Sequence, residues 1–344
     1  MRNMEGYIKG INLGGWLSQF DNYDLKHFDT FITEEDIKTI ASWGLDHVRV
    51  PVDYVVFEEE DGTPKEDGYI YLDNCVSWCE KHGLRMIIDL HKTYGYSFDP
   101  LDEDDKEAFF HQEPLQQRFY DLWRRISVRY AAHSSIVAYE LLNEIVMPTV
   151  ADEWNEIALK AISVIREAAP ESWIIFGGVM YNAVVSVPKL AKTDDPRVAY
   201  TFHCYEPMIF THQGAYWVKN MPSDFRTGYP VSDEDLETIT RLLPPELAGA
   251  VDREALKFKG AAFFENLFTA ALETADERNI PLYCGEYGVI DLASVDYTIK
   301  WLSDINAVFR KFGIGRAYWN YKEKDFGLYG DRCADKILEL TALL

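Results

Sequence analysis

The sequence predicts a parallel (β/α)8 barrel formed by a single domain that spans residues 1–344. Three observations carry this prediction. Apolar, β-branched runs end in polar or glycine-rich turns, amphipathic segments with a 3.6-residue period follow most of these runs, and eight such runs are present. An open, doubly wound sheet is the weaker alternative.

The expected strands follow one another at regular intervals along the chain. They lie at 7–13, 46–52, 85–91, 136–144, 173–179, 198–205, 281–288 and 314–322. Helices are expected between them, at 33–44, 116–130, 153–169 and 294–313, and Thr33 is placed to cap the first of these with Asp36 in its first turn. The stretch at 206–258 is too long for an ordinary loop, so we expect an inserted lid or small subdomain after the sixth strand.

The composition excludes several classes of partner. The net charge is −23, from 57 acidic and 34 basic residues, which argues against nucleic acid and against an anionic membrane surface. No apolar segment approaches the length of a membrane span or of a signal sequence, so a cytoplasmic location is expected. The five cysteines are unevenly spaced, as is typical of free thiols in a reducing compartment.

Polar side chains of particular types stand where the expected strands end. They are Arg49, His91, Asn143, Glu144, His203, Tyr205, Glu286, Trp319 and Asn320. In a (β/α)8 barrel the active site lies at this carboxyl-terminal end, because the loops that follow the strands gather there. Glu144 and Glu286 end the fourth and seventh strands, and two carboxylates on stiff strands are the groups that glycoside hydrolysis requires.

Eight segments, in this order along the chain, resemble glycoside hydrolase family 5, the cellulase family, and most of all its bacterial endoglucanase C type. They are INLGGW (11–16), HVRVP (47–51), IIDLH (87–91), LLNE (141–144), FHCY (202–205), THQGAYW (211–217), YCGEYGV (283–289) and AYWNYK (317–322). They span almost the whole chain, and as an ordered set they are far more specific than the Asn-Glu pair alone. The resemblance implies a barrel glycosidase with catalytic glutamates after strands four and seven.

The resemblance also implies a role for each matching residue. Glu144 corresponds to the general acid/base and Glu286 to the nucleophile of a retaining reaction, with a raised pKa expected for Glu144 and an ionised Glu286. The supporting roles fall to six residues: Asn143 holds the sugar 2-hydroxyl, Arg49 and Tyr205 hydrogen-bond the nucleophile, His203 lies beside the acid/base, and His91 and Trp319 line the subsite of the sugar being cleaved.

Two residues depart from the family pattern near the expected site. Lys92 stands where many relatives have a second histidine, and Glu206 stands where the endoglucanase type has an asparagine. We expect both near the substrate, where they pair with each other or with sugar hydroxyls, although solvent-facing positions are the alternative. The insertion adds four aromatic candidates, either for sugar subsites or for its own small core: Phe210, His212, Tyr216 and Trp217.

The function expected from these observations is hydrolysis of β-1,4-linked gluco- or manno-oligosaccharides by a retaining mechanism, without a metal or other cofactor. The partner is an oligosaccharide substrate, and the sequence does not indicate an oligomeric state. Two alternatives stay open. One is a non-catalytic oligosaccharide-binding protein on a glycosidase scaffold, and the other is a metal-dependent barrel hydrolase with His91 and His203 among its ligands.

Overall fold

Eight parallel strands close into a barrel in the computed structural model, which describes residues 2–100, 102 and 107–344. Each strand pairs with the next along the chain, and the last pairs with the first. The strands are β1 (Lys9–Asn12), β2 (His47–Asp53), β3 (Arg85–Lys92), β4 (Val137–Glu140), β5 (Ile174–Gly177), β6 (Val198–Cys204), β7 (Leu282–Tyr287) and β8 (Gly315–Tyr318). The predicted (β/α)8 barrel is therefore confirmed, and the open sheet is excluded.

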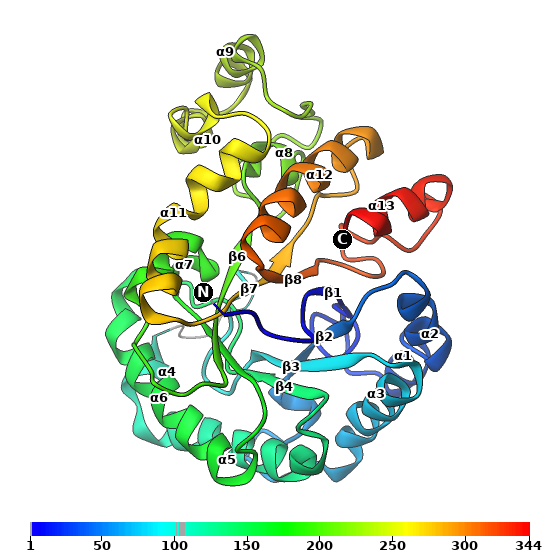
Figure 1. The fold of residues 1–344 in the computed structure, drawn as a ribbon, viewed down its shortest axis with the longest axis vertical. Helices are drawn as coiled ribbons and strands as arrows, with labels where there is room; N and C mark the ends of the chain where they lie inside the picture. Colours follow the sequence, from blue (N-terminus) through cyan, green and yellow to red (C-terminus); the bar gives the residue numbers. More distant parts are fainter. Residues whose placement is uncertain (1, 101, 103–106) are drawn as a thin grey trace.

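Helices surround the barrel and link successive strands (Figure 1). They are α1 (Leu25–Thr30), α2 (Glu34–Ser42), α3 (Tyr69–His82), α4 (Ala108–His111), α5 (Glu113–Tyr130), α6 (Ala151–Ala168), α7 (Val179–Asn182), α8 (Met208–Thr211), α9 (Asp233–Leu242), α10 (Pro245–Ala250), α11 (Ala261–Arg278), α12 (Val295–Phe312) and α13 (Ile337–Leu343). Helix α2 begins as expected, with a capping box in which the Thr33 backbone N–H donates to the Asp36 carboxylate over 2.8 Å.

On β3 and β4, side chains that point into the barrel change from apolar to polar along the strand. Ile87 belongs to the apolar cluster at the bottom of the barrel, and the next two inward positions of β3 carry Asp89 and His91. In the same way, Ala138 on β4 is followed two residues later by Glu140. Because side chains alternate with a period of two, the carboxyl-terminal half of the barrel interior is lined with charged groups.

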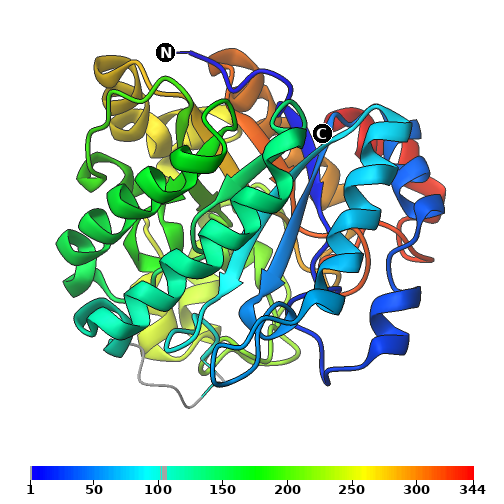
Figure 2. The same ribbon diagram turned by 90° about the horizontal axis from the view of Figure 1, so that it is seen from below.

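The strand arrows run toward the face where the longest loops gather. Figure 2 shows the blue and cyan arrows of β2 and β3 pointing to this face, while the chain begins on the opposite side. Asn143 and Glu144 lie just beyond β4, which ends at Glu140 rather than at the expected residue 144. The segment is still held on both sides, because Leu141 N donates to Ile175 O and Asn143 N donates to Leu90 O.

The insertion predicted at 206–258 contains α8, α9 and α10, of which α9 and α10 project beyond the barrel (Figure 1). Phe210 is buried against Tyr229 and so belongs to the core of the insertion itself. The five cysteines are buried and unpaired, as expected. Within the described ranges, no helix is both long and apolar enough to cross a membrane.

Candidate active site

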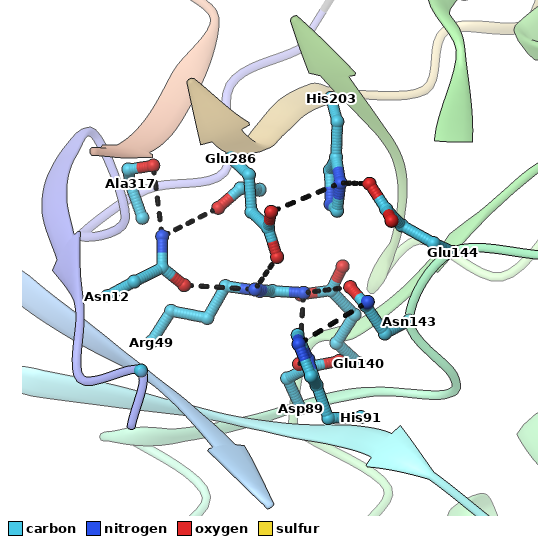
Figure 3. Close-up of polar contacts among 12 residues, drawn as sticks. Asn12, Arg49, Asp89, His91, Glu140, Asn143, Glu144, His203, Glu286 and Ala317 are labelled. Atoms are coloured by element: carbon cyan, nitrogen blue, oxygen red, sulfur yellow. Dashed lines mark hydrogen bonds and ion pairs between the residues drawn. The ribbon is translucent and has the colours of Figure 1, made fainter. Parts of the chain in front are cut away.

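Arg49 stands at the centre of the polar layer and is fully buried. Figure 3 shows its guanidinium surrounded by acceptors from other strands of the barrel. The acceptors are Glu140 Oε2 at 2.7 Å from Nε, Asn12 Oδ1 and Glu286 Oε1 each at 2.9 Å from Nη1, and Asn143 Oδ1 and Asp89 Oδ2 each at 3.0 Å from Nη2. All the guanidinium nitrogens therefore have partners, which fixes the plane of the group.

Glu286 has a fixed partner on each carboxylate oxygen. Arg49 donates to Oε1 over 2.9 Å, and the Tyr205 hydroxyl donates to Oε2 over 2.8 Å. Burial raises the pKa of Glu286 from its ordinary value, whereas Arg49 acts in the opposite direction by favouring the charged form. The two donors hold the carboxylate in one orientation, as a nucleophile requires.

Glu144 faces Glu286 across the imidazole of His203. His203 Nδ1 lies 2.8 Å from Glu144 Oε1 and 3.6 Å from Glu286 Oε2. Burial, together with the nearby charge of Glu286, raises the pKa of Glu144 well above its ordinary value, while burial holds the pKa of His203 well below its own. Of the two glutamates, Glu144 therefore has the more strongly raised pKa and holds a proton more readily.

An aromatic wall closes one side of the site. The rings of His91 and Trp319 are parallel, with their centroids 5.8 Å apart. His91 Nδ1 contacts Asp89 Oδ2 over 2.5 Å, and burial lowers the pKa of His91. Gly14 lies so close to the indole of Trp319 that a Cβ at that position would come within 2.5 Å of the ring. The structure thus brings His91 and Trp319 together beside Glu286.

A search against protein families matches the model of cellulase (glycosyl hydrolase family 5) over residues 8–325. This chain belongs to glycosyl hydrolase family 5. Cellodextrinase A of Ruminococcus flavefaciens is 44% identical over 316 residues, which cover 92% of this chain and 86% of that protein. Endoglucanase C of Acetivibrio thermocellus is 40% identical over 345 residues, covering 99% and 98%. The chain is accordingly a glycoside hydrolase, which excludes the non-catalytic alternative.

Solved structures confirm the fold of this family 5 member. Endoglucanase Cel5A of Thermotoga maritima superimposes with a TM-score of 0.76 at 24% identity, over 98% of this chain and 97% of that one. A second structure of the same enzyme, solved with mannotriose, gives a TM-score of 0.73 at 24% identity over the same shares.

Lys92 and Glu206, the two residues that depart from the family pattern, do not contact each other. Lys92 Nζ pairs with Asp102 at 2.7 Å and with Asp99 at 3.7 Å, both in the loop that follows β3. Glu206 instead lies beside the Cys204 thiol, and burial raises the pKa of its carboxyl group. Of the alternatives considered for these two residues, the pairing of Lys92 with Glu206 is therefore excluded. The reason is strand alternation, which turns Glu206 to the same side as Cys204 and away from Tyr205.

Several residues of the site were missed from the sequence. Asn12, Asp89 and Glu140 all contact the guanidinium of Arg49. Asp89 and Glu140 could have been found from their spacing, because each lies two residues from another inward-facing position of its strand. Asn12 lies in the matching segment INLGGW, but its role depends on carbonyls of Gly285, Ala317 and Tyr318, which are distant in the sequence.

Two tyrosines that were also missed lie next to Glu144. The Tyr96 hydroxyl donates to the backbone carbonyl of Glu144 over 2.6 Å and accepts from Val146 N at 2.9 Å. Tyr181 is 46% exposed and lies in the left-handed region with φ 58°. Its backbone N–H donates to Ile145 O, and the charge of Glu144 contributes to the rise in its pKa. Tyr96 follows β3 and Tyr181 lies in the short α7, so strand patterns could not reveal them.

One cluster could also hold a metal ion. Glu144, His203 and Glu286 each offer one ligand atom, and these atoms lie within 4.8 Å of one another. Carboxylate oxygens and imidazole nitrogen suit zinc and similar ions. His91, which the metal-dependent alternative used as a ligand, is outside this cluster and contacts Asp89 instead. The absence of a metal cofactor therefore stays a prediction, for which chelation is the test.

Proposed function

We propose that this family 5 enzyme hydrolyses β-1,4-linked gluco- or manno-oligosaccharides with retention of the anomeric configuration. The proposal rests on one observation, that an oxygen of Glu144 and an oxygen of Glu286 lie within 4.8 Å of each other. Retaining glycosidases hold their two carboxyl groups about 5 Å apart, whereas inverting enzymes leave about 6.5–9.5 Å so that a water molecule fits between. The short separation favours direct attack by a carboxylate.

In the first step, Glu286 attacks the anomeric carbon while Glu144 donates its proton to the departing glycosidic oxygen. The bond between that carbon and the leaving oxygen breaks, and an ester to Glu286 forms. In the second step, Glu144 takes a proton from water, the oxygen of which displaces Glu286. The raised pKa of Glu144 and the two donors on Glu286 support this division of roles.

Asn143 is the residue best placed to hold the sugar 2-hydroxyl. Its Oδ1 accepts from Arg49 over 3.0 Å, so its amide nitrogen points the other way, toward His91 Nε2 at 3.5 Å. A hydrogen bond at that hydroxyl strengthens as positive charge develops on the ring in the transition state.

The names of the relatives bear on the substrate class. A cellodextrinase and an endoglucanase, each at least 40% identical over most of the chain, support β-1,4-glucans, and the first of them supports short soluble chains. A neighbouring structure solved with mannotriose keeps mannosides in the proposal. We therefore propose soluble gluco-oligosaccharides as the main substrates, with manno-oligosaccharides as the second candidate.

The test is a product analysis with parallel sets of β-1,4-linked gluco- and manno-oligosaccharides, including mannosyl-β-1,4-N-acetylglucosamine. Proton NMR follows the anomeric form released first, and Glu286→Gln serves as the blank. We expect a β-anomer product from gluco-oligosaccharides and no turnover by the variant. An α-anomer as the first product would contradict retention, and turnover of mannosides alone would replace the glucan assignment.

Chelation tests the metal-dependent alternative separately. Enzyme dialysed against EDTA should keep its full rate on cellotetraose, because the two carboxylates complete the reaction without a metal ion. Loss of the rate, with recovery on adding zinc, would instead assign the cluster of Glu144, His203 and Glu286 to a metal.

A further inference from the structure

Strand β7 contains a bulge immediately before the proposed nucleophile. On the β6 side, Phe202 pairs with Cys284, and the next residue, His203, pairs with Glu286, so that Gly285 faces no residue of β6. The register with β8 shifts in the same place. One extra residue in a strand is the definition of a β-bulge.

The bulge turns Glu286 into the barrel. Two residues before the bulge, Tyr283 belongs to the apolar cluster inside the barrel, so strict alternation would send Gly285 inward and Glu286 outward. Glu286 instead reaches Arg49 inside the barrel, and Tyr287 packs outward against Trp301 of α12. Without the extra residue, the carboxylate would face the helix layer.

Asn12, at the end of β1, holds this bulge. Its Nδ2 lies 3.1 Å from the Ala317 carbonyl (Figure 3). The same nitrogen donates to the Gly285 carbonyl over 3.0 Å and lies 3.2 Å from the Tyr318 carbonyl. Its Oδ1 accepts from Arg49 Nη1 over 2.9 Å. That same nitrogen donates to Glu286 Oε1.

We propose that Asn12 is a positioning residue for the nucleophile, which locks the bulged backbone at Gly285 and the guanidinium of Arg49 into one arrangement and thereby sets the orientation of Glu286. The side chain is fully buried and contacts Gly285 and Arg49, so it acts through Glu286 and not on the sugar. This inference rests on the proposed role of Glu286 as the nucleophile.

An amide suits this position because it offers donors on one side and an acceptor on the other. An aspartate would have the same shape but would turn a carboxylate oxygen toward the three carbonyls. It would also add a negative charge beside Arg49 and compete with Glu286 for the guanidinium. A buried carbonyl that loses its donor is costly, so the bulge itself should relax.

The experiment compares Asn12→Asp with the wild-type enzyme in three measurements. The first is the rate of covalent labelling at Glu286 by a 2,4-dinitrophenyl 2-deoxy-2-fluoro-β-cellobioside, followed by mass spectrometry. The others are the acid limb of kcat/KM against pH and the Kd of cellobiose. We expect labelling to slow by at least about tenfold, because the variant loses a preorganised contact that orients Glu286. The Kd of cellobiose should change by less than about twofold, because Asn12 does not contact the sugar. The acid limb should move to higher pH.

Asn306→Asp provides the matched control. Asn306 is also fully buried and accepts from an arginine, Arg316 Nε at 2.9 Å, but it lies on α12 behind the barrel wall. This variant should lose thermal stability in the same way and keep the wild-type labelling rate and acid limb. If Asn12→Asp does not fold, Asn12→Ser retains a small polar group and takes its place.

The inference is overturned if the Asn12 variant labels at the wild-type rate with an unmoved acid limb, or if the Asn306 variant is slowed to the same extent. Failure of the retaining proposal looks different, because then the wild-type enzyme itself would not be labelled at Glu286. In that case the acid limb and kcat on cellotetraose still decide whether Asn12 acts on the site.

Discussion

Arg49 carries one positive charge against three carboxylates that contact it directly, Asp89, Glu140 and Glu286. All of them lie in the buried polar layer, where unbalanced negative charge is unfavourable. Burial raises the pKa of Asp89 and of Glu140 to about 7 each, even though Arg49 lowers both. At acidic pH, where both groups carry a proton, the charge of Arg49 is therefore balanced mainly by Glu286.

Arg49→Lys tests this balance. An ammonium group cannot reproduce the fork of donors that contacts Glu286 and the other acceptors, so Glu286 loses stabilisation of its charged form. Its pKa should rise further, and because attack requires the ionised form, the acid limb of kcat/KM should move to higher pH. We expect kcat on cellotetraose to fall by about 10²-fold. An unchanged acid limb in the pH profile would contradict the role of Arg49.

Glu144→Ala tests the proposed role of Glu144 as the residue that donates a proton to the leaving group. Hydrolysis of cellotetraose, whose leaving group needs a proton, should slow by about 10²–10⁴-fold. Cleavage of a 2,4-dinitrophenyl glycoside needs no proton for departure and should slow far less in its glycosylation step. Pre-steady-state rates on the two substrates give the comparison, and equal losses would assign the proton to another residue.

At the scale of single elements, β2 ends at Asp53, whose carboxyl group is buried. The Ser18 hydroxyl donates to it over 2.7 Å, and burial raises its pKa to about 7, with Lys92 acting in the opposite direction. In the unfolded chain the same group titrates near pH 4. Between about pH 4 and pH 7 the folded protein therefore holds a proton that the unfolded chain releases, so this group makes the free energy of unfolding fall as pH rises.

Asp53→Asn removes that titration. The melting temperature of the variant relative to wild type should therefore increase from pH 4.5 to pH 8, by a few degrees in total. Circular dichroism melts at pH 4.5, 6 and 8 measure the difference. A difference that stays constant over this range would show that Asp53 does not carry the raised pKa.

At the scale of the whole molecule, the barrel and the insertion differ in how firmly they are held. Every residue of β2 is buried, whereas α9 buries little more than Leu236 and Ile239 and projects beyond the barrel (Figure 1). The first part of the insertion contacts the site, because the ring of His212 packs on the ring of Tyr205 with ring centroids 5.0 Å apart. Local opening should therefore be easier in α9 than in the barrel.

Hydrogen exchange measures this difference directly. Amides of α9 should exchange far sooner than those of β2, while the peptide around His212 should show intermediate protection. Equal protection of α9 and β2 would mean that insertion and barrel open as one unit, and the insertion would then count as part of the barrel core.

The sequence by itself determined the strand order and the chemistry of the strand ends. Strand and helix periods are local properties, so the eight runs and the rim residues Arg49, Glu144 and Glu286 could be found without coordinates. Tertiary structure decided what depends on contacts between distant segments. Three features depend on such contacts: the pairing of Lys92 with Asp102, the position of Glu206 beside Cys204, and the contact of Asn12 with the bulge next to Glu286. A one-residue change in strand register reverses the direction of a side chain, and no local pattern in the sequence records it.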